Sequence, residues 1–343
     1  MEQIIIKNIS EETIDIYKTC FDRNGSPKNE ENIKWQFLSR PNYKKYVDIA
    51  FDEAASKTAA IYAVSPVPFK IGENKVIGTQ SLDTITDVDY RGKGWFIKLA
   101  NSVYQKAAND GVALVYGFPN GNSIHGFKKK LDWAVLDPVP FLIKPLGSEY
   151  FTKKLSFLKF LPNIKFSYFK YKNSKKYNLI ENRTFPVDVD RIWQNFVRDI
   201  IVCVNRNKEY LDWRYIHKPN ENYRIIHCYD EKQNYQGFIV FVVKEKHDGK
   251  IGYIMELIYN PDFPETGKLL LQYANDRIRK QNADCILSWC MEHSPNYSVF
   301  KREFYINMPE KIRPIELHFG VRSFDEKFTD IVNKRENWYI SYS

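Results

Sequence analysis

Residues 86–133 read TDVDYRGKGWFIKLANSVYQKAANDGVALVYGFPNGNSIHGFKKKLDW, and this stretch decides the fold of the first half of the chain. The alternating run Val76–Val88 leads into it and predicts a long strand. A helix is predicted next, because apolar residues recur at helical spacing at Phe96, Leu99, Ala100, Val103 and Ala107. Gly111 ends that helix. A buried strand over 112–118 and a short helix over 122–131 follow, so the order is typical of a layered α/β domain.

The loop Asp89–Gly94 joins the long strand to the helix, and its residues suit a phosphate. Gly92 and Gly94 allow a tight turn, and the helix that follows adds unpaired N-terminal amides. Arg91 and Lys93 add charge-assisted contacts. The loop is no Walker motif, because no Gly-Lys-Ser/Thr follows, and a dinucleotide fingerprint would need a third glycine. A site for a pyrophosphate is predicted; a plain strand-to-helix turn is the alternative.

The sequence contains an internal repeat. Residues 34–53 (KWQFLSRPNYKKYVDIAFDE) match 212–231 (DWRYIHKPNENYRIIHCYDE) at an offset of 178, and 127–129 match 300–302 at an offset of 173. Extended runs follow each Trp-bearing helix, at 47–51 and 59–64 and again at 223–229, 236–244 and 251–259. We therefore predict two tandem α/β domains, each with a mixed, mostly antiparallel sheet flanked by helices. The expected boundaries are 1–147, a basic aromatic linker at 148–185, and 186–343, with Phe141–Pro145 as a strand of the first domain.

Composition and charge narrow the class of protein. The 343 residues include 43% hydrophobic and 15% aromatic side chains, which is enough for packed cores. Most of the net charge of +9 comes from residues 141–180, which contain nine lysines and one acidic residue. The basic charge is therefore concentrated in one segment. The five scattered cysteines make no CxxC pair and indicate buried thiols in a reducing compartment. No signal peptide or spanning segment is evident, and a cytoplasmic protein without a metal is expected.

Residues 86–133 resemble the GCN5-related N-acetyltransferase (GNAT) superfamily, whose signature Arg/Gln-x-x-Gly-x-Gly/Ala binds the pyrophosphate of coenzyme A. Arg91 and Gly94 match it, whereas Phe96 stands where the family has Gly or Ala. The resemblance implies acetyl-CoA as cofactor and extends to the segment from Asn120 to Trp133, which would flank the pantetheine arm. The implied cofactor residues are Val88, Arg91, Gly92, Lys93, Gly94, Trp95, Phe96, Asn120, Asn122 and Phe127.

The second copy does not keep this loop. It reads Asp262-Phe263-Pro264-Glu265-Thr266-Gly267, with one glycine, a proline that lacks an amide donor, and an added acid. We therefore expect a GNAT-like second domain that binds no cofactor.

Three side chains are candidates for proton transfer in the first domain. Asp83 lies on the long strand, where the family often has an acid, and His125 lies near the expected thiol position. Tyr116, on the following strand, would be the acid. A hydrogen-bonded strand residue, a surface histidine and a core tyrosine are the respective alternatives. Glu256, in the second copy's long strand, is a weaker candidate for a position in a cleft.

The resemblance favours acetyl transfer to a primary amine on a small polar acceptor. An amino sugar, nucleotide-linked or free and used in surface polysaccharide synthesis, is the favoured acceptor. The alternatives are an aminoacyl-tRNA-dependent transferase of the peptidoglycan-bridging type and a non-catalytic module that binds coenzyme A or RNA. The intact loop argues against a nucleic-acid partner. The lysines of 153–176 could make a weak contact with an acidic membrane surface or attract a phosphorylated acceptor; a solvated linker is the alternative that we favour.

Overall fold

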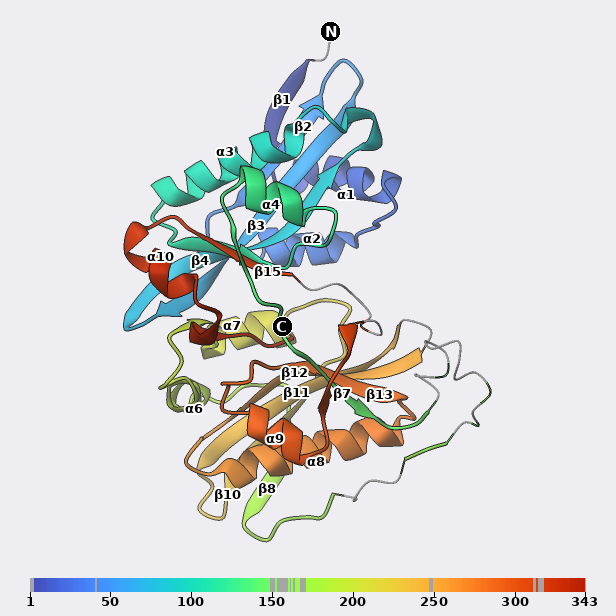
Figure 1. Ribbon diagram of the computed structural model, residues 1–343, viewed down its shortest axis with the longest axis vertical. Coiled ribbons are helices and arrows are strands. Elements are labelled where there is room, and N and C mark those ends of the chain that lie inside the picture. The colour runs from blue at the N-terminus through green and yellow to red at the C-terminus, as the bar shows by residue number, and fades with distance from the viewer. Residues whose placement is uncertain are drawn as a thin grey trace. The chain divides into compact units, whose positions relative to one another are not determined.

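The structure is a computed structural model that describes residues 3–40, 42–148, 152, 160, 162, 164–166, 171–246, 249–310, 313 and 318–342. The chain divides into two compact units, each with its own sheet (Figure 1). The first unit comprises Met1–Pro138, His217–Asn220 and Leu317–Asn337; the second comprises Val139–Ile216, Glu221–Glu316 and Trp338–Ser343. Two mostly antiparallel sheets with helices were predicted, and this prediction is confirmed.

The first sheet has a long central hairpin. Its strand order is β1 (Ile4–Asn8), β2 (Tyr46–Asp52), β3 (Lys57–Ile71), β4 (Asn74–Thr86), β5 (Leu114–Gly117), β15 (Phe319–Ser323) and β6 (Ala134–Leu136). Neighbours along this path pair antiparallel, except that β4 and β5 are parallel. The predicted strand before the loop is thus β4, and the strand predicted after the helix is β5.

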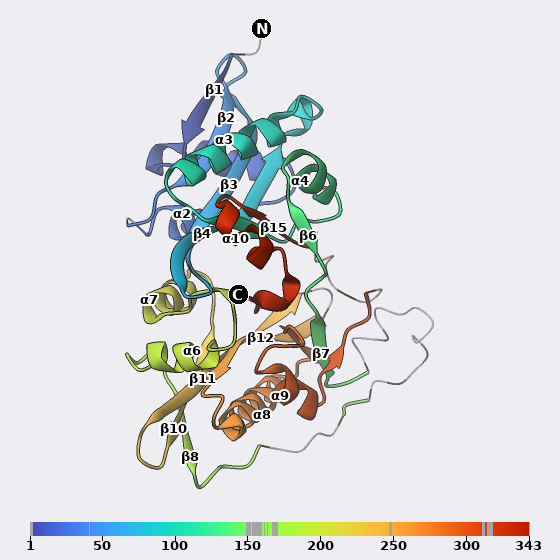
Figure 2. The same ribbon diagram turned by 60° about the vertical axis from the view of Figure 1, so that its left-hand side comes forward.

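Helices cover both faces of this sheet (Figures 1 and 2). α1 (Ile14–Arg23) and α2 (Glu30–Phe37) pack on one face, and α3 (Trp95–Asn109) and α4 (Ile124–Lys130) on the other. Alternate residues of β3 enter the two cores, because successive side chains of a strand point to opposite faces. Ile61 and Ala63 join the core of α1 and α2, whereas Tyr62 and Val64 join that of α3. The short elements η1 (Glu11–Thr13), η2 (Val88–Tyr90), α10 (Glu326–Val332) and η6 (Arg335–Asn337) complete the unit.

The second unit repeats this plan. Its strand order is β14 (Ile306–Asn307), β7 (Phe141–Pro145), β13 (Cys285–Trp289), β12 (Gly249–Tyr259), β11 (Tyr235–Lys246), β10 (Arg224–Asp230) and β8 (Tyr177–Glu181). Here too the long strand β12 is parallel to the next strand, β13. The helices are α6 (Val189–Phe196), α7 (Lys208–Leu211) with η4 (Asp212–Ile216), α8 (Pro264–Lys280) and α9 (Tyr297–Arg302), and β9 (Val202–Val204) pairs with β16 (Trp338–Tyr339).

One strand of each repeat lies in the sheet of the other repeat, which corrects one prediction. Phe141–Pro145 is a strand, as predicted, but it pairs with β13 in the second sheet and not in the first. The strand at the equivalent place in the second repeat, β15, pairs with β5 in the first sheet. Because β15 occupies the edge of β5, no place remains there for β7. The repeats have exchanged equivalent strands, and local sequence patterns carry no signal for such an exchange.

The segment predicted as a linker contributes to the second sheet. Tyr177–Glu181, inside the predicted range 148–185, forms β8 and pairs with β10. Of the lysines behind the membrane-surface prediction, Lys153, Lys154, Lys159 and Lys170 lie outside the described residues.

Three further observations bear on the class of protein. All five cysteines are buried and free. Within the described part of the chain, no group of three or more His, Cys, Asp and Glu side chains could hold a metal ion. The helices of the described residues are too short or too polar to cross a membrane.

Candidate functional site

The loop between β4 and α3 has the backbone shape that its glycines predict. Gly92 and Gly94 both have φ of +77°, and Gly94 is the N-cap of α3. A Cβ at either position would meet no atom within 4 Å, so glycine is needed here for its backbone conformation and not for space. Gly94 brings no side chain to cap the helix, and the first turn of α3 holds no acid. The first-turn amides are therefore suited to an external anion.

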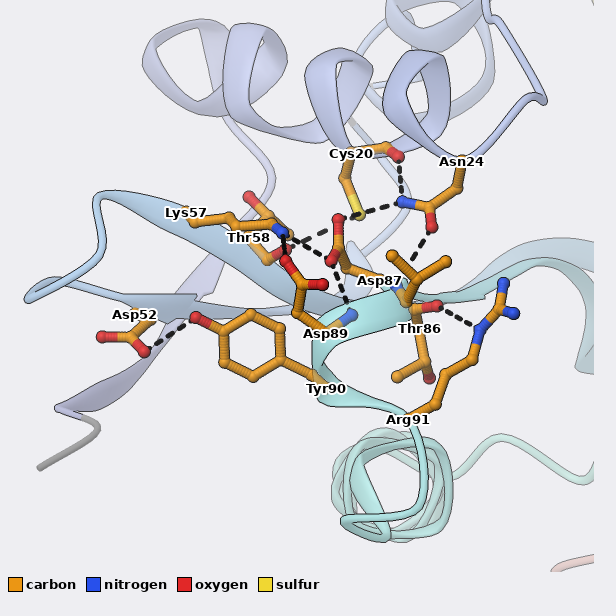
Figure 3. A network of polar contacts seen from close by, with 11 residues as sticks. Cys20, Asn24, Asp52, Lys57, Thr58, Thr86, Asp87, Asp89, Tyr90 and Arg91 are labelled. Carbon is orange, nitrogen blue, oxygen red and sulfur yellow. Dashed lines mark hydrogen bonds and ion pairs between the residues drawn. The ribbon is translucent and has the colours of Figure 1, made fainter.

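A polar network holds the base of this loop in place (Figure 3). The buried carboxylate of Asp87 accepts from the Lys57 ammonium at 2.6 Å, the Asp89 amide at 3.1 Å and the Asn24 amide side chain at 3.2 Å. Asn24 in turn accepts from the Val88 amide at 3.2 Å. On the other side, Tyr90 donates to Asp52 at 2.8 Å. The network ties the loop to α1, β2 and β3.

Replacing Asp87 with Asn should destabilise the first domain by about 2 kcal/mol, because the nearly buried Lys57 ammonium would lose one of its two carboxylate partners and keep only the exposed Asp89. Burial alone would raise the pKa of Asp87. Lys57, the Asp89 amide and Asn24 outweigh that effect and lower the pKa below its ordinary value of 3.8. The stabilisation is thus complete above that value and is lost as the pH falls through the lowered folded-state pKa. Urea unfolding of both proteins between pH 3 and 7 tests this.

The control is Asp89→Asn, which removes the other, exposed carboxylate bound to Lys57. It should cost less than about 1 kcal/mol, since exposed ion pairs are weak. Equal losses of unfolding free energy for the two variants would contradict the claim that the buried Asp87 stabilises the domain more than the exposed Asp89 does.

A groove of about 600 Å³ opens beside the loop. This volume suits a cofactor-sized ligand. The cations Arg91, Lys129 and Lys130 line it, and no acidic side chain does so in the described part of the chain. The remaining lining residues are Thr86, Tyr90, Gly92, Gly94, Trp95, Phe96, Ile97, Asn122, His125 and Gly126. Its charge therefore favours an anionic ligand.

Phe96, the departure from the family signature, is accommodated by a second glycine. A Cβ on Gly126 of α4 would lie 2.7 Å from Cε1 of the Phe96 ring. The ring also contacts Phe127 and Tyr62, with centroids 5.1 Å and 6.0 Å away. Phe96 thus joins α3 to α4 and takes the space that a larger residue at position 126 would need.

Gly126→Val should destabilise the first domain by about 2 kcal/mol through overpacking. In a Phe96→Ala background the same change should be almost neutral, because the ring it would meet is gone. A double-mutant cycle on urea unfolding measures this coupling. Additive losses would show that the contact does not decide which residue position 126 accepts.

The long strand β4 carries a bulge and then separates from β5. Ala63 pairs with Asp83 and Val64 with Ser81, so Leu82 is the extra residue. The parallel β4–β5 pairing runs from Thr79 to Ser81, opposite Val115 to Gly117. Beyond Ser81 the strands diverge toward the loop, and β4 has backbone groups there that β5 does not bind. The bulge also explains why Ser81 and Asp83 contact different cores.

Asp83 lies one residue past the bulge and is buried. One carboxylate oxygen accepts from the Tyr17 hydroxyl at 2.7 Å, and the other accepts from the Lys28 ammonium at 2.7 Å. Burial raises the pKa of Tyr17 first, and the charge of Asp83 raises it further. Tyr17 therefore keeps its proton and donates it in the hydrogen bond to the Asp83 carboxylate.

Aromatic side chains pack beside Ser81, where β4 begins to separate from β5. This aromatic cluster comprises Tyr62, Phe96, Tyr104, Phe127 and Trp133. Tyr62 and Tyr104 share a hydrogen bond of 2.5 Å, Trp133 donates to Tyr104 at 3.0 Å, and Tyr62 bonds the Ser81 hydroxyl at 3.1 Å. Burial raises the pKa of Tyr62, so its hydroxyl stays protonated at neutral pH.

The structure brings only some of the predicted residues to the groove. Seven of them line it: Arg91, Gly92, Gly94, Trp95, Phe96, Asn122 and His125. Others support it. Asn120 accepts from the Asn122 and Ser123 amides at 3.1 Å each, Phe127 lies in the aromatic cluster, and the Lys93 ammonium lies over the Tyr90 ring. Tyr116 is buried against Phe69 and Phe118.

Sequence reasoning missed the residues that support the site from a distance. Lys57 and Asn24 hold the loop, and Tyr17 and Lys28 hold Asp83, yet each is remote in sequence from the group it binds. Lys129 and Lys130 could have been found, because they sit in the last turn of the predicted short helix.

The comparisons with known proteins agree with this geometry. Residues 7–136 match the family model described as Acetyltransferase (GNAT) domain. This part of the chain is a GNAT domain. The prediction of a GNAT-type N-acyltransferase is thereby confirmed at that level. A search of curated proteins found no significant match.

Solved structures resemble the chain as a whole. Saccharomyces cerevisiae N-myristoyltransferase with bound myristoyl-CoA is 11% identical, with a TM-score of 0.61 over 94% of this chain and 82% of that one. A probable N-acyltransferase from Enterococcus faecalis V583 is 11% identical, with a TM-score of 0.60 over 94% of this chain and 73% of that one. At such identities the likeness shows the fold: a tandem arrangement of which residues 7–136 are the GNAT domain.

The second unit has the same bulge but a different loop. Val240 pairs with Glu256 and Phe241 with Ile254, so Met255 is the extra residue of β12. α8 begins with Pro264, has Glu265 in its first turn and has no side-chain cap. The Tyr259 ring fills the space beside Gly267, where a Cβ would lie 2.5 Å from the ring. Glu256 is buried against Arg206 at 2.6 Å.

Proposed function

We propose that this chain transfers an acetyl group from acetyl-CoA to a primary amine, with the chemistry in its GNAT domain. The observation that carries the proposal is the left-handed Gly92–Gly94 turn, which opens α3 beside Arg91 and a cationic groove. These are the donors that a pyrophosphate needs. Thr86, in the part of β4 beyond its last pair with β5 at Ser81, lines the groove.

The cofactor would supply an activated thioester, and the chain's own groups account for the rest of the reaction. Arg91 and the first-turn amides of α3 bind the pyrophosphate. The β4 backbone beyond the bulge offers amides that β5 leaves unbound, and these polarise the carbonyl. Asp83 takes the proton of the amine. The Ser81 hydroxyl, bonded to Tyr62 at 3.1 Å, donates to the departing sulfur.

The aromatic cluster supports a short acyl group. Where β4 begins to separate from β5, the buried Tyr104 hydroxyl is hydrogen-bonded to both Tyr62 and Trp133, which are also buried. A Cβ on Gly117 would already lie 3.1 Å from the Ser81 carbonyl oxygen and 3.4 Å from Trp133. A long-chain acyl group, such as that bound to the yeast enzyme, would have to displace this packing. We therefore propose acetyl-CoA over long-chain acyl-CoA.

The acceptor we would test first is an amino sugar, nucleotide-linked or free, as the sequence resemblance suggests. For the second domain we propose a supporting role without cofactor. Pro264 removes one amide donor from the start of α8, and Glu265 adds a negative charge to its first turn.

The test is to follow thiol release from acetyl-CoA with a panel of amino sugars, amino acids and polyamines. Release that depends on one class of amine supports the proposal and names the acceptor. Binding of acetyl-CoA without release for any amine would favour a non-catalytic module instead. Salt-sensitive binding of tRNA with no affinity for acetyl-CoA would overturn the proposal in favour of an aminoacyl-tRNA-dependent transferase.

A further inference from the structure

A lysine of the chain itself occupies the place where an acceptor amine would meet Asp83. The Lys28 ammonium lies 2.7 Å from Asp83 Oδ1, and it also lies 4.7 Å from the centroid of the Phe21 ring. A carboxylate on one side and an aromatic face on the other make a site for a primary ammonium group. Lys28 lies in the segment between α1 and α2, and its side chain is 29% exposed.

The second unit also has an ion pair at the equivalent positions, formed by Arg206 and Glu256. Lys28 and Arg206 are separated by 178 residues, the offset of the first match in the internal repeat. Asp83 and Glu256 are separated by 173 residues, the offset of the second match. Each carboxylate follows its bulge by one residue, and each cation precedes an Asn that caps the next helix, Asn29 or Asn207. The pair is thus part of the duplicated fold.

The two pairs differ in chemistry and in access. In the second unit the side chains are 3% and 0% exposed, and the Ser341 hydroxyl bonds both partners, at 2.7 Å to Arg206 and 2.8 Å to Glu256. The Arg206 guanidinium stays charged and cannot act as a nucleophile. In the GNAT domain the cation is a primary amine that is partly open to solvent. The GNAT domain, which contains the Gly92–Gly94 loop, is therefore also the unit whose cation is an amine that can be acylated.

We propose that Lys28 is an internal acetyl acceptor, so that the chain modifies its own Lys28 from acetyl-CoA. This inference rests on the proposed function, which places the thioester beside the bulge of β4. The Lys28 amine, after losing its proton to Asp83, attacks the acetyl carbonyl. A C–N bond forms, the C–S bond breaks, and the departing thiolate takes the second proton of the Lys28 nitrogen and leaves as coenzyme A thiol. Asp83 passes the first proton to water. The acetylated side chain is neutral, so Asp83 has lost its ion-pair partner and its carboxylate becomes available to an external amine.

The experiment is to incubate the purified full-length chain with acetyl-CoA alone and follow acetylated peptides by mass spectrometry. Lys18, which is 38% exposed and paired with Asp22, is the internal reference for non-enzymatic acetylation. We expect Lys28 to be acetylated at least about 10-fold faster than Lys18, at a rate independent of protein concentration. Excess free coenzyme A should reduce the Lys28 rate to that of Lys18. Lys28→Arg, which copies the second unit's cation, should carry no acetyl group at position 28.

Acetyl-CoA-dependent thiol release to an external amine with Lys28 acetylated no faster than Lys18 would overturn this inference and leave the proposed function intact. A rate that rises in proportion to protein concentration would also overturn it, because the transfer would then be between chains. If the wild-type chain does not bind acetyl-CoA at all, both the inference and the proposed function fail.

Discussion

Acetyl-CoA binding should fall by at least about 100-fold in the double variant Arg91→Ala, Gly94→Glu. The arginine supplies a charge-assisted contact of about 1.5–3 kcal/mol, and the glutamate places a negative charge at the N-terminus of α3. Together these effects exceed about 3 kcal/mol, which corresponds to the stated loss. Isothermal titration with acetyl-CoA measures it directly.

Two controls separate this loss from a loss of folding. Gly94→Ala imposes the backbone strain of a Cβ at φ +77° without adding charge, so it should cost less affinity than Gly94→Glu. Gly72→Glu adds the same side chain at another left-handed glycine, in the β3–β4 turn, and should leave affinity unchanged. Unchanged affinity for acetyl-CoA in the double variant, with a native circular dichroism spectrum, would show that the loop does not bind the cofactor.

Asp83→Asn should lower kcat by about 100- to 10,000-fold, the usual contribution of a general base. Affinity for acetyl-CoA should stay within a factor of two or so of wild type, because Asp83 does not line the groove. Asn keeps the shape of the side chain and can still accept from Tyr17. Steady-state kinetics with the acceptor found in the amine panel, together with titration of acetyl-CoA, gives both quantities.

The matched control is Asp48→Asn, which removes another buried carboxylate of the same sheet. Asp48 accepts from Lys106 at 2.5 Å and from Ser102 at 2.6 Å, both on α3, and β3 lies between its strand β2 and the bulged strand β4. It should reduce stability and leave kcat unchanged. A similar fall in kcat for both variants would show that Asp83 acts through folding and not as a base.

Local features of the fold were predictable because their causes lie within a few residues. The succession of β4, the glycine turn and α3 follows from alternation, from Gly92 and Gly94, and from the apolar face of the helix. The duplication was also visible, because Trp35 and Trp213 and the residues around them match at one offset. The left-handed glycine turn before α3 was predictable for the same reason, whereas its binding of a phosphate stays a prediction.

The features that were not predicted depend on contacts between distant parts of the chain. The exchange of β7 and β15 joins each of these strands to a sheet neighbour, β13 or β5, that lies in the other half of the sequence. No periodicity in Phe141–Pro145 distinguishes one sheet from the other. Likewise, the pairing of Lys28 with Asp83 depends on how α1 and α2 pack on the sheet. The bulge at Leu82 has no glycine or proline to mark it.

The most direct test of a single cofactor site in the GNAT domain is the stoichiometry of acetyl-CoA binding to the wild-type chain by isothermal titration. We predict one acetyl-CoA per chain, with no binding that survives the Arg91→Ala, Gly94→Glu change. Two acetyl-CoA per chain, or one that persists in that variant, would contradict it, because the second unit would then hold the cofactor despite Pro264 and Glu265.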